Sequence, residues 1–226
     1  MIRVLHLILA IASAAVLEVG ALFPIVNPLG SAAIFLNMIG GASEKVQRLL
    51  AQKIAVYSFF LLIGSLLWGV KVLSFFGISI YAVQIGGGLV VAATGWTLLG
   101  QSPQDSKSAS MRDDDILATA FYPFTLPITV GPGSISVAIT LGAHLPAELH
   151  AGSIFSPRVL VASIIGIVLI CLIIYICYRY ARRAELLLGA SGTSVFMRLS
   201  SFILLCIGIQ IISAGVKAYL SSLGLH

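Results

Sequence analysis

Two short segments combine proline, glycine and hydroxyl side chains inside otherwise apolar sequence. The first reads FPIVNPLGS, residues 23–31, and the second reads LPITVGPGS, residues 126–134. Proline removes a backbone N–H and clashes with the carbonyl one turn back, so each segment predicts a break in a helix. Freed backbone groups can bind a small polar solute, because an N–H suits a carboxylate and a carbonyl suits an ammonium group or a cation.

The composition indicates which solvent surrounds these breaks. Of 226 residues, 59% are hydrophobic and 9% are charged, whereas soluble domains carry roughly 25% charged residues. With a mean hydropathy of +1.08, the chain is predicted to be an all-α integral membrane protein. A spanning helix needs about 20 apolar residues. The charge-free runs predict six transmembrane helices, at about 13–39, 54–71, 78–99, 116–141, 158–178 and 198–219.

In hydrocarbon, an unsatisfied backbone group costs several kcal/mol, and irregular backbone is tolerated only where it faces protein or a wet cavity. The predicted breaks in the first and fourth helices must therefore face inward. Their glycines allow close approach, and their polar side chains add donors and acceptors. The residues predicted to bind substrate are Asn27, Pro28, Gly30, Ser31, Thr129, Gly131, Pro132, Gly133 and Ser134.

The N-terminal stretch MIRVLHLILAIASAAV has two interpretations. Its basic start, apolar run and Ala12-Ser13-Ala14 are typical of a signal peptide, of which the first 14 residues would be removed. The apolar character continues to Ile39, however, which favours a first helix that starts early or lies partly along the interface.

The basic residues predict the orientation of the chain. Three connectors carry Lys45, Arg48, Lys53, Lys107, Arg112, Arg179, Arg182, Arg183 and Arg198, and the opposite side carries Arg3, Lys71, Arg158 and Lys217. The positive-inside rule places the richer side in the cytoplasm and both termini outside. The net charge of +5 is therefore a topology signal, and nucleic acid is not an expected partner.

A polar linker at 101–115 divides the chain into halves, 1–100 and 116–226. Its closing Asp113-Asp114-Asp115 could form a cation site, but a solvated helix start, where carboxylates favour the positive helix end, is the favoured interpretation. A shift of 103 residues aligns Pro24 with Pro127, Ile25 with Ile128, Gly30 with Gly133 and Ser31 with Ser134. Because each half has three helices, the second half enters from the opposite face, which predicts inverted repeats. Inverted repeats with broken helices are typical of secondary transporters that bind substrate near the midplane.

Other polar residues have competing interpretations. Glu18 is an ionisable group within the first helix, which by default suggests function such as proton coupling, yet it could lie at the outer interface. Gln84 and Gln210 could face a cavity or join helices, and the glycines at 86–88 indicate close helix packing.

Metal and catalytic chemistry have little support in the sequence. His144, Glu148 and His150 share an outer loop, but Pro146 interrupts their spacing and no second cluster supports a metal. Cys171, Cys177 and Cys206 lie in apolar spans and are expected to behave as small hydrophobes. We find no Walker loop, no nucleophile with a base and no paired carboxylates. We therefore expect neither an enzyme nor an ATP-driven pump, and no cofactor or metal.

Four segments together resemble a known family. NPLGSAAIFL, FGISIYAVQIGGGLVVAATGW, LPITVGPGSISV and RLSSFILLCIGIQIISAG are similar to the MarC family, over about residues 17 to 217. The resemblance implies a six-helix bacterial inner-membrane protein of the LysE-type exporter group, in which some relatives are described as neutral amino-acid transporters. The family motifs correspond here to Asn27, Pro28 and Gly30, and to Gly131, Pro132 and Gly133. Glu18 lies outside the family pattern.

The sequence thus favours a secondary transporter or exporter of a small solute such as a neutral amino acid. The lipid bilayer and the small solute are its expected partners, with a proton or sodium ion for coupling and a homo-oligomer as further hypotheses. The alternative is a non-transporting inner-membrane partner or scaffold protein. An intramembrane enzyme is a third hypothesis, disfavoured by the missing catalytic dyad.

Overall fold

The computed structural model describes residues 2–40, 42–100, 113–150 and 157–224, and within them it contains helices and no strand. The all-α prediction is therefore confirmed for this part of the chain. In chain order the elements are α1 (Ile2–Val26), α2 (Pro28–Ile39), α3 (Glu44–Phe75), α4 (Ile80–Gly100), α5 (Asp113–Ala118), the π-helix η1 (Ala120–Thr129), α6 (Pro132–His150) and α7 (Pro157–Ser222).

Five helical stretches among the described residues are long and apolar enough to cross a membrane. They are Ile11–Leu36, Glu44–Phe75, Ile80–Gly100, Leu160–Gly189 and Gly192–Ser222. Ala120–Thr129 and Pro132–Ala143 form a sixth candidate, bent by 69° at the break between them. This pair occupies the position of the predicted fourth span, so the count of six holds if the pair crosses the membrane as one unit.

Several helices extend beyond the predicted spans. α3 begins at Glu44 rather than 54, where the Ser43 Oγ accepts a hydrogen bond from the Val46 N–H at 3.3 Å. α7 continues through the basic connector and bends only at Gly189, with φ 67° and ψ 174°. The charged residues mark the limit of the hydrocarbon, not of the helix, because lysine and arginine are good helix formers.

The N-terminal helix α1 covers Ile2–Val26 without interruption, as the early-start interpretation predicts. Whether its first residues are removed stays open. α5 begins at Asp113, which confirms that the three aspartates start a helix. The polar linker before it, residues 101–112, lies outside the described residues.

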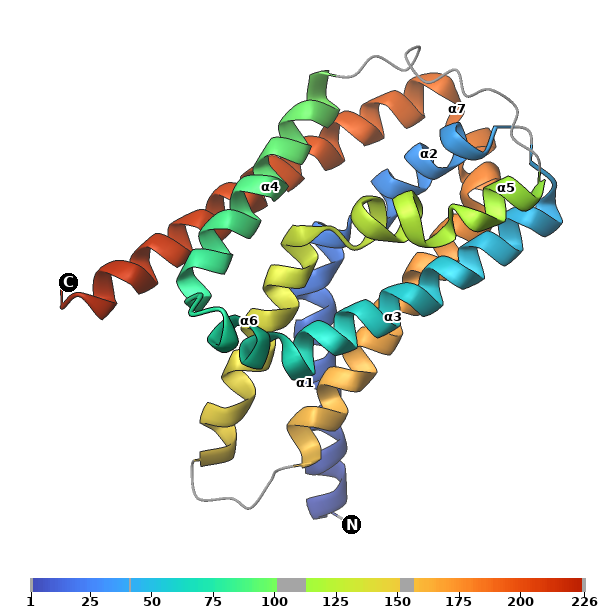
Figure 1. Cartoon of the computed structure of the whole chain (residues 1–226). Coiled ribbons are helices and arrows are strands. Elements are labelled where there is room, and N and C mark those ends of the chain that lie inside the picture. The colour runs from blue at the N-terminus through green and yellow to red at the C-terminus, as the bar shows by residue number, and fades with distance from the viewer. Residues whose placement is uncertain (1, 41, 101–112, 151–156, 225–226) are drawn as a thin grey trace.

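The helices form one bundle in which the first part of α7 packs beside α1 and α3, and its second part beside α4 (Figure 1). Fully buried side chains at its centre include Leu22, Phe35, Leu62, Ile170 and Tyr178. Large apolar side chains such as Phe60, Trp68 and Trp96 are more than half exposed. An outer surface of this kind suits contact with lipid tails.

Glycines bring α4 and the second part of α7 almost into backbone contact. A Cβ built on Gly88 would lie 2.8 Å from the Gly208 carbonyl oxygen, and one on Gly95 would lie 2.6 Å from the Leu205 nitrogen. A Cβ on Gly87 would lie 2.5 Å from the Ser136 Cβ, whereas a Cβ on Gly86 would have no atom of another element within 4 Å. The packing interpretation of the glycine triplet is therefore confirmed for Gly87 and Gly88.

Two helix contacts are related in the way that inverted repeats require. Gly166 of α7 faces Ala15 and Glu18 of α1, and Gly142 of α6 faces Leu66 of α3. In the predicted repeat, the first helix of each half thus packs on the second helix of the other. The contacts fit that arrangement, and the repeat itself and its boundaries stay predictions.

Candidate functional site

The first break is a single residue, Asn27, between α1 and α2. Its backbone has φ 44° and ψ 57°, a left-handed conformation that asparagine tolerates better than most residues. The Asn27 Oδ1 accepts a hydrogen bond from the Gly30 N–H at 3.2 Å, which caps α2 just after its first residue, Pro28.

Helical hydrogen bonding continues across this break. The Asn27 N–H donates to the Phe23 carbonyl at 2.9 Å, and the Ser31 N–H donates to the Asn27 carbonyl at 2.9 Å. The Asn27, Gly30 and Ser31 amides therefore all have acceptors. Pro24 and Pro28 have no N–H, so the prediction that the prolines free backbone groups applies here to carbonyls. One left-handed residue and one side-chain cap keep these three amides hydrogen-bonded while the chain changes direction.

The second break is far longer than predicted. The interruption expected at 127–133 begins at Ala120, where the chain forms a π-helix with extended backbone at Tyr122 and Leu126. Pro123, which the sequence analysis did not single out, shares this segment with Pro127. Hydrogen bonds to the fifth preceding residue, such as Val130 N–H to the Thr125 carbonyl at 2.8 Å, accommodate prolines that the ordinary helical pattern would exclude.

Hydroxyl side chains replace some of the missing amide donors. The Thr125 Oγ1 donates to the Ala120 carbonyl and the Thr129 Oγ1 to the Phe124 carbonyl, both at 2.7 Å. In the first break, the Ser31 Oγ donates to the Val26 carbonyl at 3.2 Å. All three bonds reach back five residues. Such bonds let serine and threonine re-satisfy backbone that breaks leave exposed in a membrane.

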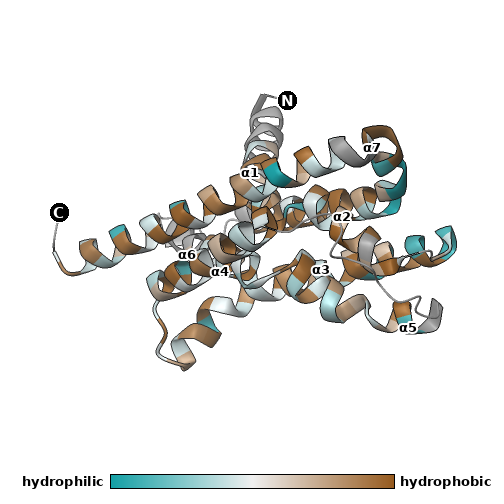
Figure 2. Ribbon diagram, turned by 90° about the horizontal axis from the view of Figure 1, so that it is seen from above, coloured by the Kyte–Doolittle hydropathy of each residue, from teal (hydrophilic) through white to brown (hydrophobic). Residues whose placement is uncertain are grey.

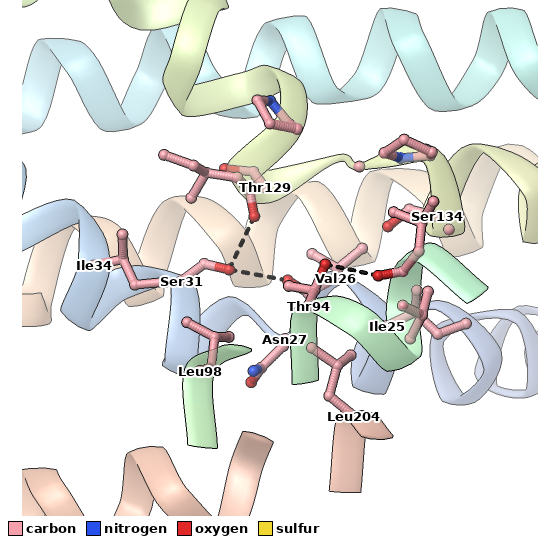
Figure 3. Close-up of a pocket in the computed structure, with 17 residues that line it drawn as sticks. Ile25, Val26, Asn27, Ser31, Ile34, Thr94, Leu98, Thr129, Ser134 and Leu204 are labelled. Carbon is pink, nitrogen blue, oxygen red and sulfur yellow. Dashed lines mark hydrogen bonds between the residues drawn. The ribbon is translucent and has the colours of Figure 1, made fainter. Parts of the chain in front are cut away.

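The two breaks lie against each other (Figure 3). The Ser31 Oγ is also 3.2 Å from the Ile128 carbonyl oxygen, so one hydroxyl joins both segments. Between them is a cavity of about 200 Å³. Seven of the predicted site residues line it, namely Asn27, Ser31, Thr129, Gly131, Pro132, Gly133 and Ser134. Their role in binding stays a prediction.

Two predicted site residues do not line the cavity. Pro28 is buried behind it, and the space beside Gly30 is filled by the Asn27 side chain. A Cβ on Gly30 would lie 2.4 Å from the Asn27 Nδ2. The expectation that Gly30 leaves room for a ligand is therefore wrong, because this glycine makes room for the cap. Gly133 does line the cavity, where a Cβ would lie 2.0 Å from the Val91 Cγ2.

Most of the cavity wall was not predicted. The further lining residues are Ile25, Val26, Ile34, Val90, Val91, Thr94, Leu98, Pro127, Ile128 and Leu204. Ile25, Pro127 and Ile128 belong to the two repeat motifs, but the residue types of the others carry no signal, since apolar residues occur throughout these helices and only packing decides which of them face the breaks. Thr94 is the polar exception, and its Oγ1 donates to the Val90 carbonyl at 2.8 Å. None of the described residues that line the cavity carries a charge.

Tyr178 supports the second break from behind and was also missed. Its hydroxyl lies 2.7 Å from the Thr129 Oγ1. Because the Thr129 proton is directed to the Phe124 carbonyl, Tyr178 is the donor. The Tyr178 ring stacks on Phe35 with centroids 4.7 Å apart, and the Gln47 Nε2 donates to the Tyr178 carbonyl at 2.9 Å. The signal in the sequence was a tyrosine hydroxyl within a predicted apolar span, which needs a hydrogen-bond partner.

The three other predicted cavity residues lie elsewhere. Glu18 is half-buried, its Oε1 accepts a hydrogen bond from the Ser163 Oγ, and its buried Oε2 has no partner among the described residues. Gln84 packs against Gly215, and Gln210 is exposed. The side chains of His144, Glu148 and His150 lie outside the described residues, and the remainder contain no group of metal ligands.

Long apolar helices and two broken segments that meet at an uncharged cavity define a multi-pass membrane protein with an internal polar site. The chain belongs to the MarC family: the family described as "MarC family integral membrane protein" matches residues 12–220. The chain is 32% identical over 202 residues to the UPF0056 inner membrane protein MarC of Salmonella typhimurium, covering 86% of this chain and 90% of that protein. The protein of the same name from Escherichia coli O1:K1 / APEC is 32% identical over 203 residues, with the same coverage.

No solved structure matches the chain. The names of these relatives and the apolar helices together identify a multi-pass protein of the bacterial inner membrane, as predicted. Which end of the bundle faces the cytoplasm stays a prediction of the positive-inside rule.

Proposed function

We propose that the protein is a secondary transporter of a small neutral amino acid, which binds in the cavity between the two breaks. The observation that carries the proposal is the cavity itself. Two repeat-related irregular segments meet there, and the described wall offers hydroxyls, an amide and backbone groups but no charge. Such a wall suits a solute of zero net charge with polar ends, because a net charge away from water would lack a partner.

The start of α6 offers the best position for a carboxylate. Its first residue, Pro132, has no N–H, and the amides of Gly133 and Ser134 belong to the first turn, which lacks intrahelical acceptors. Both residues line the cavity, and the positive end of the helix dipole favours an anion there. The corresponding turn of α2 is already capped by Asn27, so the second break provides the stronger anion site.

Two carbonyls beside the Ser31 hydroxyl suit an ammonium group. The Ile128 and Val26 carbonyls both point to the Ser31 hydroxyl, which has one proton for two acceptors. A second donor can therefore bind there. The apolar wall of α4, with Val90 and Val91, then faces the amino-acid side chain.

The size of the cavity limits the solute. Its volume of about 200 Å³ is below the roughly 300–1,000 Å³ of sites for drug-sized ligands. A cavity of this size favours small solutes such as glycine, alanine and serine over aromatic amino acids.

The test is transport by the purified full-length protein in liposomes. Labelled glycine, alanine, serine, lysine, glutamate and phenylalanine are offered with and without proton and sodium gradients. The proposal expects movement of the three small neutral amino acids that exceeds movement of the others and of empty liposomes. Failure of all six, with no binding by calorimetry, would favour the scaffold function.

A further inference from the structure

A second cavity lies at another place in the bundle, where α3 begins and α7 approaches its bend. It has a volume of about 450 Å³ and is lined by Glu44, Lys45, Gln47, Arg48, Arg179, Tyr180, Arg182, Arg183 and Leu186. Five of these side chains are cationic and one is a carboxylate. Figure 2 shows the hydrophilic residues gathered at this end of the two helices. The cavity therefore favours an anion.

The arginines on α7 are held in place without being neutralised. The Arg179 guanidinium lies 5.4 Å from the centroid of the Tyr180 ring, and its Nη1 donates to the Tyr175 hydroxyl at 3.2 Å. Arg183 lies 5.5 Å from the Tyr180 ring centroid, and the Arg182 Nη2 donates to the Ala42 carbonyl at 3.0 Å. None of these contacts is with a carboxylate, so the positive charge remains available to a ligand. Guanidinium groups bind phosphate through paired hydrogen bonds.

An apolar groove adjoins this cavity between the same two helices. It has a volume of about 580 Å³ and is lined by Arg48, Gln52, Ala55, Val56, Phe59, Phe60, Val168, Cys171, Leu172 and Tyr175. Arg48 lines both spaces, so the basic cavity and the groove adjoin at this residue. The groove lies on the apolar stretches Glu44–Phe75 and Leu160–Gly189 and therefore opens toward lipid tails.

We propose that an anionic phospholipid binds here, with its phosphate among the arginines and one acyl chain in the groove. A soluble anion would use the cations but leave the groove empty, and an apolar partner helix would use the groove but leave the cations unpaired. A phospholipid satisfies both, and basic pockets between transmembrane helices on the cytoplasmic side suit anionic headgroups. By the positive-inside rule this is the cytoplasmic leaflet. The inference does not depend on transport.

Native mass spectrometry of the purified full-length protein tests the headgroup site. Dioleoyl-phosphatidylglycerol and dioleoyl-phosphatidylethanolamine, which share acyl chains, are titrated in detergent. We expect tighter binding of phosphatidylglycerol, and a loss of roughly 30-fold in Arg48→Gln with Arg183→Gln, which corresponds to about fivefold per removed cation. The control pair Lys53→Gln with Arg198→Gln removes the same charge outside the cavity and is expected to bind as the unaltered protein does. Equal binding of both lipids, or an equal loss in the control pair, would overturn the proposal.

The groove is tested by blocking it. Val168→Trp fills it, whereas Val161→Trp places the same ring at another exposed position of α7 outside the groove. We expect weaker phosphatidylglycerol binding for the first variant alone. Inorganic phosphate at the same concentration is expected not to displace the lipid. If phosphate displaces it and Val168→Trp binds normally, the site recognises an anion and not a phospholipid.

Discussion

The two breaks differ in how hydrogen bonds compensate for the interrupted helix. The first is one left-handed residue whose side chain caps the next helix, so Asn27 supplies both the turn and its compensation. The second extends from Ala120 to Gly131 and bends the chain by 69°. Its hydrogen bonds include contacts with distant helices, through Ser31 to Ile128 and through Tyr178 to Thr129.

The first break is therefore stabilised mainly by residues close in sequence, and the second also by residues of other helices. Apart from the bond from Ser31 to Ile128, the hydrogen bonds described for the first break lie within five residues, and the Asn27, Gly30 and Ser31 amides are already used. The second break depends on α2 and α7 for its shape and leaves the first turn of α6 open toward the cavity. We therefore expect substrate to bind chiefly to the second break, and the first break to position the hydroxyl that joins them.

The largest effect is expected from filling the second break. Gly133→Val places a branched side chain where even an added Cβ would lie 2.0 Å from the Val91 Cγ2, and overpacking of this kind costs about 1–3 kcal/mol. Transport in liposomes should be abolished. Gly86→Val is the matched control, because Gly86 has no neighbour within 4 Å. If the double variant Gly133→Ala with Val91→Ala binds substrate and Gly133→Val does not, the loss results from the side-chain volume at this position. Normal transport by Gly133→Val would mean that the substrate binds elsewhere.

The next largest effect is expected at Asn27, where two substitutions distinguish the contribution of the side-chain cap from that of the left-handed backbone. Asn27→Ala loses a cap worth about 1 kcal/mol and retains a left-handed conformation that costs about 1–2 kcal/mol without glycine or asparagine. Asn27→Gly also loses the side-chain cap, but glycine at an N-cap costs only about a few tenths of a kcal/mol and adopts the left-handed conformation freely. Its unfolding midpoint in denaturant should therefore stay close to that of the unaltered protein. Equal stability of the two variants would contradict the local account of this break. Substrate binding lost in both would assign the amide a role in recognition.

A smaller effect is expected where α7 supports the second break. Thr129→Val leaves the buried Tyr178 hydroxyl without its acceptor, at a cost of about 1–3 kcal/mol. Adding Tyr178→Phe removes the orphaned donor, so the double variant should be less destabilised than the sum of the two single changes. Thr97→Val is the control, since Thr97 bonds only within its own exposed turn. Additive losses in thermal unfolding would mean that this contact does not support the break.

The smallest effect on stability is expected at Glu18, outside both breaks. No described residue of the cavity wall titrates near neutral pH, so a pH dependence of transport must originate elsewhere. Glu18→Gln retains an acceptor for the Ser163 hydroxyl and should flatten the pH profile of transport while the protein remains folded. An unchanged profile would leave Glu18 with a structural role between α1 and α7.

The sequence by itself determined the class of protein and the positions of its breaks. Apolar runs of sufficient length predict spanning helices because the bilayer cannot hydrate exposed backbone. Prolines at 28, 127 and 132 lie in or beside the breaks because proline has no amide to donate, whereas Pro24 lies within the regular helix α1. The spans and the breaks can both be predicted from short stretches of sequence in a lipid environment, because neither depends on contacts between distant residues.

Only the tertiary structure decided how those breaks are compensated and what surrounds them. The second break is bonded to Ser31 of α2 and Tyr178 of α7, and the role of Gly30 depends on the position of the Asn27 side chain. The cavity wall on α4 and the basic cavity between α3 and α7 unite residues that are far apart in sequence. The same residue types also occur at many lipid-facing or solvent-exposed positions of this chain. Only the packing of the helices determines which of them lie together.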